Sequence, residues 1–358
     1  MSDLQVGVVG VGALGRHHAR ILAGMEGVTL IGIVDVRTET AVAVAEQYGC
    51  EALPDHAALL DRVDAAVIAV PTTGHLEVAR DFLRRRVPLL VEKPLAADVA
   101  EAREIVEAAE SHGTLLQVGH VERFNPTTRT AWPLIESPRY IRAERFSPFA
   151  FRSMDIGVVL DVMIHDVDLV LDLAKSPVCR VEAFGLSILG DKEDCVQARL
   201  TFENGCIADL SANRVHPGVR RSLTAISAER SVTVDFHARE VACYSRSDRL
   251  RYGPSPLDLA KRPDADIDAL KRGMFGSFVN VERPAVPDAD ALTDELASFI
   301  DCVRTGRKPL VGGSEALAAM ETADAILRCV DEHSWTGNAA GPVGPHLFAV
   351  DPPARRAA

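Results

Sequence analysis

The stretch LQVGVVGVGALGRHHAR, residues 4–20, decides the fold of the first part of the chain. It begins with an uninterrupted run of Val and Gly, a pattern typical of a strand that is buried on both faces. A helical pattern follows from Gly12 to about Met25. Gly10 and Gly15 complete a GxGxxG spacing at the junction. This context predicts a strand that turns sharply into a helix.

Short apolar runs continue to alternate with helical patterns up to about residue 120. The strands predicted after the first are VTLIGIVDV, AAVIAV, PLLVEKP and TLLQVGH, at residues 28–36, 65–70, 88–94 and 114–120. Helices are predicted at residues 39–48, 75–86 and 98–111, the last with Asp98 as its N-cap. Apolar strands that alternate with helices are typical of a parallel sheet covered on both faces. We therefore predict an α/β, doubly wound Rossmann domain over residues 1–124.

The glycine turn is chemically suited to a dinucleotide. Gly10 permits the tight turn, Gly12 lets a pyrophosphate approach the backbone, and Gly15 lets the helix pack closely on the strand. Asp35 ends the second strand, about 20 residues further on, where a carboxylate binds the ribose hydroxyls and repels a 2′-phosphate. Arg37 is the nearby residue that would favour a phosphate instead. The predicted cofactor is NAD rather than NADP.

The second part of the chain has a different pattern. From about residue 139 to 244 the strands are longer and alternate apolar with polar residues, and Asn-Gly in FENGCIADL predicts a hairpin with a type I′ turn. An apolar helix at 160–174 precedes most of them, and residues 245–290 form a polar, Pro-rich excursion. We predict an α+β domain over 125–333 with a large, mostly antiparallel open sheet for catalysis and oligomerisation. Its helices 292–305 and 315–329 would pack back on the first domain, and 334–358 would be a flexible tail.

Two motifs place polar groups where a cofactor crevice is expected. Glu92-Lys93-Pro94 ends a strand, and the carboxyl ends of strands line the crevice of a doubly wound sheet. Asp161 and His165 are four residues apart, so they share one face of an otherwise apolar helix. The alternatives are a surface lysine and a core histidine with a capping aspartate. Polar groups on an apolar helix are costly unless they pair or act chemically.

The segments GVVGVGALGRHHAR, VEKP and DVMIHDVDLV resemble, in order and spacing, the glucose–fructose oxidoreductase, inositol dehydrogenase and rhizopine catabolism (Gfo/Idh/MocA) family over residues from about 4 to 330. The resemblance implies that Lys93, Asp161 and His165 contact a sugar substrate. The predicted cofactor-binding residues are Gly10, Gly12, Ala13, Leu14, Gly15, Asp35, Arg37, Pro71, Thr72, His75, Glu92 and Lys93. The predicted substrate-binding residues are Lys93, Arg123, Asn125, Arg152, Asp161 and His165.

The predicted reaction is oxidation of a sugar hydroxyl to a ketone. In this hypothesis His165 takes the hydroxyl proton, and Lys93 donates a hydrogen bond to the same oxygen as negative charge develops there. Asp161 orients the substrate or the imidazole. Lys93 is the alternative base, if burial lowers its proton affinity. No metal is predicted, because the cofactor carries the hydride chemistry and no typical zinc spacing is present.

A local excess of arginine gives a clue to the chemical class of the substrate. Between residues 123 and 152 there are six arginines against two acids, and guanidinium groups bind phosphate in bidentate fashion. The alternative to phosphate binding is that these arginines lie on a strand face that is solvated or paired at an interface. The segments VGHVERFNP and RSMDIGVVLDVMIHDVDLVL resemble a branch whose members act on the 3-hydroxyl of UDP-N-acetylglucosamine, toward a 3-amino sugar of lipid A. A free polyol such as inositol is the second candidate substrate, and a non-catalytic NAD(H) sensor is the alternative of another class.

The overall composition of the chain limits the classes of molecule that it is expected to bind. The net charge of -12 disfavours nucleic acid and anionic membranes, and no apolar run reaches the length of a membrane span. Seven scattered cysteines, with no signal peptide, indicate a reducing compartment, so a cytoplasmic location is predicted. We also expect a homo-oligomer, either a dimer or a tetramer, because the open sheet leaves a face to cover. An aminotransferase is the expected functional partner.

Overall fold

The computed structural model describes residues 3–151 and 156–334. Contacts within the chain divide it into two compact units. Within the described residues, unit 1 comprises 3–125, 156–168 and 289–328, and unit 2 comprises 126–151, 169–288 and 329–334. The predicted flexible tail beyond Ser334 lies outside the described residues. Three separate pieces of chain therefore build unit 1, which contains the glycine turn and both polar motifs.

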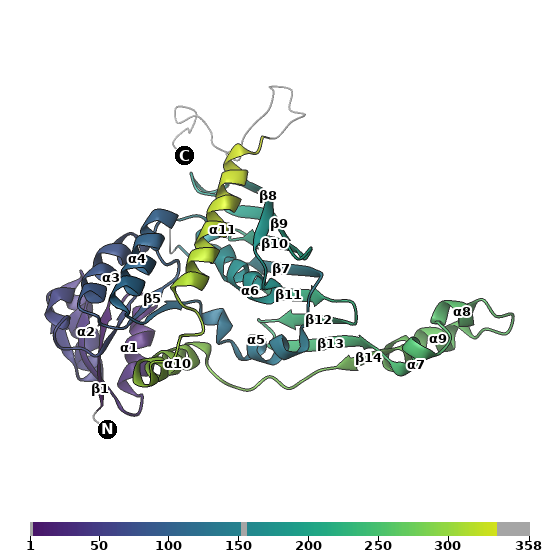
Figure 1. Ribbon diagram of the computed structural model, residues 1–358, viewed down its shortest axis with the longest axis horizontal. Helices are drawn as coiled ribbons and strands as arrows, with labels where there is room; N and C mark the ends of the chain where they lie inside the picture. The colour runs from purple at the N-terminus through teal and green to yellow at the C-terminus, as the bar shows by residue number, and fades with distance from the viewer. Residues whose placement is uncertain (1–2, 152–155, 335–358) are drawn as a thin grey trace. The chain divides into compact units, whose positions relative to one another are not determined.

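Unit 1 is built around a six-stranded parallel sheet with the strand order β3-β2-β1-β4-β5-β6 (Figure 1). The strands are β1 (Leu4–Val9), β2 (Val28–Val34), β3 (Glu51–Leu53), β4 (Ala65–Ile68), β5 (Leu89–Glu92) and β6 (Leu116–Gly119). The helices that alternate with them are α1 (Gly15–Ala23), α2 (Thr38–Tyr48), α3 (His75–Arg84) and α4 (Val99–His112). The order reverses between β1 and β4, the place where doubly wound sheets bind their ligands. The predicted α/β fold is confirmed.

The boundaries in unit 1 follow from local chemistry. Helix α4 begins after Asp98, whose carboxylate accepts the Glu101 N–H at 2.9 Å, and ends at Gly113 with a φ of 61°. Helix α1 starts at Gly15 rather than at the predicted Gly12, because the intervening residues form the turn itself. Strands β4, β5 and β6 are buried along their whole length, which explains why their sequences are apolar except at Glu92 and Gln117.

The last part of unit 1 comes from the C-terminal third of the chain. Helix α10 (Ala291–Thr305) places Leu296, Phe299 and Ile300 in the core that α1, β1 and β2 form. Helix α11 (Gly313–Glu332) starts against α4, where a Cβ at Gly313 would lie 2.9 Å from the Val106 side chain. The chain therefore returns to the dinucleotide fold after completing the second sheet.

Unit 2 contains an eight-stranded sheet with the order β14-β13-β12-β11-β7-β10-β9-β8 (Figure 1). Only β7 and β10 pair in parallel, so the predicted open and mostly antiparallel sheet is confirmed. Helix α6 (Ile164–Ala174) ends in this unit, and the short helix α5 (Pro126–Ala131) begins it. The strands are β7 (Tyr140–Phe146), β8 (Val178–Leu186), β9 (Cys195–Phe202), β10 (Ile207–Asn213), β11 (Arg220–Ile226), β12 (Arg230–Asp235), β13 (Glu240–Arg246) and β14 (Val279–Glu282).

The β9–β10 hairpin exists as predicted, but its turn type differs. Gly205 has a φ of 82°, whereas Asn204 is not among the residues with positive φ, as a type I′ turn would require. The Asn204 side chain explains the difference. Its oxygen accepts the Cys206 N–H at 3.0 Å, and its amide donates to the Ala174 carbonyl at 2.9 Å. The asparagine thus stabilises a three-residue loop with glycine at the left-handed position.

The predicted excursion contains regular structure that the sequence did not reveal. Between β13 and β14 lie the short helices α7 (Asp248–Tyr252), α8 (Pro256–Ala260) and α9 (Ile267–Gly273) (Figure 1). Side chains of Ser247, Ser255 and Asp266 cap their N-termini. These helices have only five to seven residues each, too few to show a hydrophobic period in the sequence.

Candidate active site

The glycine turn after β1 leaves open space at one position only. A Cβ at Gly10 would lie 2.6 Å from the Ala69 oxygen, and one at Gly15 would lie 1.8 Å from the Gly10 oxygen. A Cβ at Gly12 would meet nothing within 4 Å. Gly10 and Gly15 are thus required by the packing of the protein, whereas the space beside Gly12 is open to a group from outside. This arrangement fits the pyrophosphate of a dinucleotide at the start of α1.

Asp35, just after β2, is fixed beside the glycine turn. Its carboxylate accepts the Val11 N–H and the Arg37 N–H, each at 2.9 Å, and its side chain is 7% exposed. The Arg37 Nε lies 3.6 Å from the same carboxylate, with the guanidinium side chain largely exposed. A carboxylate held in this way keeps lone pairs available for ribose hydroxyls. Its negative charge opposes a 2′-phosphate.

The end of β4 is tied to the turn after β5 through His75. Pro71 and Thr72 lead into α3, whose first residue is His75. The buried His75 ring lies 3.0 Å from the Val70 oxygen on one side and 3.0 Å from the Pro94 oxygen on the other. Burial lowers the pKa of His75, which favours the neutral ring. Because these contacts are to backbone carbonyls, the ring positions the turn that carries Lys93, and its direct contact with a cofactor stays a prediction.

Lys93 and Asp161 are brought together although 68 residues separate them. Lys93 follows β5, and its bond to Pro94 is cis. Its Nζ donates to the Asp161 carbonyl oxygen at 2.5 Å and lies 3.6 Å from the Asp161 carboxylate. The two side chains are 15% and 10% exposed. The site thus holds a cation and an anion in partial contact with solvent.

The Asp161–His165 segment is not one regular helix. Residues Val159–Met163 form a π-helical turn, η5, and α6 begins only at Ile164. A π-turn has a wider spacing than the α-helix used to place Asp161 and His165 on one face. His165 lies in the first turn of α6 and is half-buried. Single-turn π segments are frequent at functional sites.

Arg123 is engaged in an ion pair inside unit 1. Its Nε donates to the Asp168 carboxylate at 2.8 Å, and both side chains are buried. His120 lies 3.9 Å from the same carboxylate, and burial lowers its pKa. Asn125 donates to Glu122 at 2.9 Å. Substrate contacts by Arg123 and Asn125 stay predictions, and the structure shows that Arg123 also neutralises a buried carboxylate.

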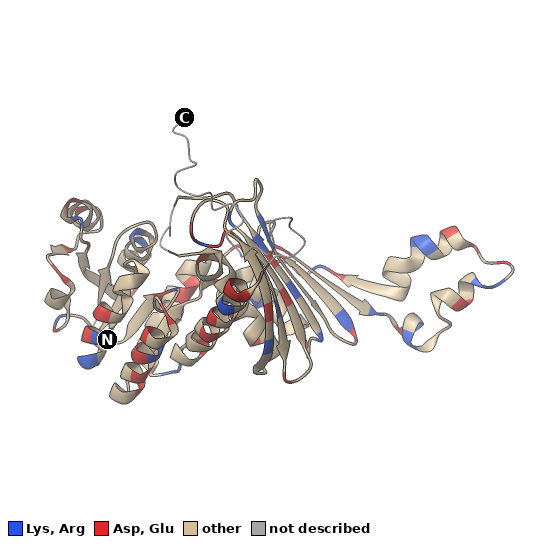
Figure 2. Cartoon of the chain, turned by 90° about the horizontal axis from the view of Figure 1, so that it is seen from above, with Lys and Arg blue, Asp and Glu red and all other residues tan. Residues whose placement is uncertain are grey.

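The arginines around β7 do not gather in one place. Successive strand residues point to opposite faces, so Arg142 lies on the exposed face, where it contacts Glu144, while Arg145 lies on the buried face over the Phe236 ring. Acidic and basic residues are intermixed along the strands of this sheet (Figure 2). Arg142 and Arg145 therefore do not share a face, and phosphate binding by the other described arginines stays a prediction. Arg152 lies outside the described residues.

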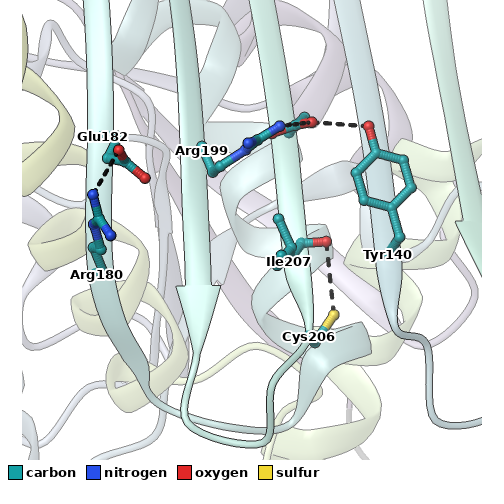
Figure 3. A network of polar contacts seen from close by, with 7 residues as sticks. Tyr140, Arg180, Glu182, Arg199, Cys206 and Ile207 are labelled. Carbon is teal, nitrogen blue, oxygen red and sulfur yellow. Dashed lines mark hydrogen bonds and ion pairs between the residues drawn. The ribbon is translucent and has the colours of Figure 1, made fainter.

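The exposed sheet face carries a further network that the sequence analysis missed (Figure 3). Arg199 binds the Asp209 carboxylate through two nitrogens at 2.7 and 2.8 Å, and the Tyr140 hydroxyl donates to it at 2.9 Å. The hydrogen bonds from Arg199 hold the pKa of Asp209 below its usual value. Strand alternation could have placed these residues on one face, but their pairing depends on a register that only the fold determines.

Residues 3–151 and 156–334 contain neither a metal-binding cluster nor a helix that could span a membrane. No group of three or more His, Cys, Asp or Glu side chains there could hold a metal ion. No helix in the same ranges is long and apolar enough to cross a membrane.

Comparison with known proteins identifies both parts of the chain. The family model for the NAD-binding Rossmann fold of the GFO/IDH/MocA oxidoreductases matches residues 4–120, and that for the GFO/IDH/MocA C-terminal domain matches residues 102–233. The UDP-N-acetylglucosamine 3-dehydrogenase of Acidithiobacillus ferrooxidans is 34% identical over 323 residues, 89% of this chain and 96% of that protein. Its solved structure has a TM-score of 0.81 at 32% identity and covers 92% of this chain and 98% of that one.

More distant relatives are also similar over most of the chain. The inositol 2-dehydrogenase of Rhizobium meliloti is 25% identical over 345 residues, 92% of this chain and 97% of that protein. The solved structure of GenD2 from gentamicin A biosynthesis, in complex with NAD, has a TM-score of 0.73 at 22% identity and covers 93% of this chain and 95% of that one. The likeness to GenD2 is one of fold alone.

Proposed function

The chain belongs to the GFO/IDH/MocA oxidoreductase family, and on this premise we propose that it oxidises the 3-hydroxyl of UDP-N-acetylglucosamine to a ketone with NAD as the acceptor. The observation that carries the substrate is the 34% identity, over 96% of its length, to a protein with that activity. The Lys93–Asp161 contact supplies the chemistry of a dehydrogenase site. The arginines of the described residues lend the diphosphate no separate support, because those around β7 are divided between two faces of the sheet.

NAD is the cofactor of this family's Rossmann domain, and when bound it supplies a hydride acceptor. We propose that the glycine turn and the start of α1 hold its pyrophosphate. Asp35 would hold the adenine ribose, since its carboxylate is already fixed beside the turn. The turns after β4 and β5 would face the nicotinamide, because β4 borders the switch point of the sheet and β5 is the next strand.

The chain's own residues would control the hydroxyl proton. A carboxylate 3.6 Å from Lys93 Nζ favours the charged ammonium, so Lys93 acts as a hydrogen-bond donor to the substrate oxygen. His165, half-buried on α6, would take the proton as general base. Asp161 would hold Lys93 through both its carbonyl and its carboxylate. Lys93 as the base is the alternative assignment.

Two other functions are the alternatives. Oxidation of a free polyol is favoured by the 25% identity to an inositol 2-dehydrogenase. A non-catalytic NAD(H) sensor would need only the glycine turn and Asp35. The retained Lys93–Asp161 contact argues for turnover.

A substrate panel separates these functions. The protein is mixed with NAD and either UDP-N-acetylglucosamine or myo-inositol, with an amine trap for the keto product, and NADH is followed by absorbance. We expect turnover of the UDP-sugar, lost in Lys93→Met and retained in Lys261→Met, a matched change at an exposed lysine. Turnover of inositol alone would replace the proposed substrate. Tight NAD binding without turnover of any sugar would favour the sensor.

The biological setting follows from the same proposal. A 3-keto UDP-sugar is the substrate that an aminotransferase needs to make a 3-amino sugar, so we propose such a partner and a place in lipid A synthesis. The described residues carry seven free cysteines, which favours the reducing cytoplasm. We also propose a homotetramer that covers the exposed face of the eight-stranded sheet, and light scattering of the purified protein tests it.

A further inference from the structure

Unit 1 contains a buried polar cluster directly behind Lys93. It is formed by His18 on α1, Glu92 at the end of β5, Gln117 on β6 and Glu295 on α10. His18, Gln117 and Glu295 are 0% exposed, and Glu92 is 7% exposed. Four elements thus converge on one apolar interior to place polar side chains there.

Glu92 is the centre of this buried cluster. One of its oxygens lies 2.6 Å from His18 Nε2, and the other accepts the backbone N–H of Lys93 at 3.3 Å. A Cβ at Gly119 would lie 2.8 Å from Glu92, so β6 leaves room for the carboxylate only because it has glycine there. Glu92 therefore connects α1 to the residue that carries the candidate catalytic amine.

In the part of the chain that the structure describes, Glu295, unlike Glu92, is buried without hydrogen bonds to its carboxyl group. Among the described residues, neither of its carboxyl oxygens has a hydrogen-bond partner, and the Gln117 side-chain oxygen also lacks one. Gln117 instead donates to the backbone oxygen of Glu295 at 3.2 Å. Burial raises the pKa of the Glu295 carboxyl well above its usual value, and the negative charge of Glu92 adds to the rise. An ionised carboxylate without partners is among the costliest groups to bury.

We infer that Glu295 is a neutral carboxylic acid that leaves a single negative charge, on Glu92, behind Lys93, and that it is thereby a positioning residue for the candidate site. The role of Glu295 in positioning Lys93 rests on the proposed dehydrogenase function, whereas the protonation of Glu295 does not. Ionisation of Glu295 would place a second negative charge beside Glu92, on oxygens that have no hydrogen-bond partner among the described residues. The cluster would then hold Lys93 differently.

The other charged or titratable groups come from the neighbouring elements. Helix α10 contacts α1 and the short 3-10 helix η3 (Val121–Arg123), and it shares the buried cluster with β5 and β6. The groups on these elements and at their ends are Arg16, His17, His18, Arg20, Glu92, Lys93, His120, Glu122 and Arg123. His18 is hydrogen-bonded to Glu92, and the cations Arg123 and Lys93 each contact a carboxylate of their own, on Asp168 and Asp161.

The protonation of Glu295 is tested without substrate. Wild type and Glu295→Gln are unfolded with denaturant at pH values from 5 to 9. A carboxyl whose pKa is raised by folding keeps its proton in the native state while the unfolded chain releases it above about pH 4.3. Its stabilisation is present at low pH and is lost as pH rises toward the folded value. Each unit of difference between the two pKa values changes the folding equilibrium constant tenfold.

We therefore expect the stability of wild type, relative to Glu295→Gln, to fall as pH rises. Glu107→Gln, on the exposed face of α4, is the matched control and should run parallel to wild type. If Glu295→Gln does not fold, Glu295→Met gives the same comparison, because it also has no proton to lose. The inference would be overturned if the free energies of unfolding of wild type and the neutral variant differed by the same amount at all pH values.

The positioning role is tested by the pH profile of kcat/KM in the full-length enzyme. Glu295→Gln should keep wild-type activity near neutral pH and move the alkaline limb to higher pH, an effect that a purely structural residue would not have. An unmoved limb together with a pH-dependent stability difference would retain the bound proton and refute the positioning role. If no sugar is turned over, the proposed function fails while the unfolding result still decides the protonation of Glu295.

Discussion

Replacing Gly12 by Ala separates cofactor binding from folding. In the structure a Cβ at Gly12 meets nothing within 4 Å, and the φ of Gly12 is one that other residues adopt. Gly→Ala at such a site stabilises a protein by about 0.4–1 kcal/mol through the unfolded state. The Cβ would occupy the space where a pyrophosphate approaches the backbone. Loss of one hydrogen bond to a charged group costs about 1.5–3 kcal/mol, which raises Kd by about 10- to 100-fold.

Isothermal titration calorimetry with NAD and thermal unfolding together test this separation. Gly24→Ala is the control, because its Cβ would make only ordinary contacts at 3.8 Å after α1. Gly15→Ala should unfold far more readily, since its Cβ would lie 1.8 Å from the Gly10 oxygen. The account of the turn is refuted if Gly12→Ala binds NAD as tightly as wild type.

Four further predictions concern the named side chains. Asp35→Ser should weaken NAD binding and relax the preference against NADP, measured as the ratio of the two Kd values; an unchanged ratio would contradict the role of this carboxylate. His165→Ala should lower kcat by about 100- to 10,000-fold if it is the general base, and near-normal turnover in His165→Ala but not in Lys93→Ala would assign the base to lysine. Arg123→Met should lower the free energy of unfolding by about 3–5 kcal/mol, because it leaves a buried carboxylate unpaired; unchanged stability in urea would limit Arg123 to a substrate contact. The lowered pKa of His120 means that the unfolded chain binds its proton first as pH falls, so stability should decrease below about pH 6.5; His120→Gln should show a shallower decrease.

The fold was largely predictable because its main signals are local. The glycine spacing after β1, the apolar runs of β4 to β6 and the cap at Asp98 each depend on neighbouring residues only. The strands of the second sheet alternate clearly enough to indicate its class. The short helices between β13 and β14 were missed because they rest on single capping residues such as Ser247 and Ser255.

The site was predictable as a list of residues but not as an arrangement. The motifs named Lys93 and Asp161, yet only the fold brings them within 3.6 Å. A count of arginines along the chain does not show that they lie together, since Arg142 and Arg145 point to opposite faces. Glu295 left a readable signal, since it lies one position before Leu296 on the apolar face of α10, where a carboxylate is out of place.

The most direct test of the proposed function follows one hydrogen atom. The enzyme is incubated with NAD and UDP-N-acetylglucosamine carrying deuterium at C3, and the reduced cofactor is analysed by mass spectrometry. The account predicts deuterium in NADH, and none when the label is at C2. Reduced cofactor that lacks the C3 label, or no reduction with this sugar while inositol is oxidised, would contradict it.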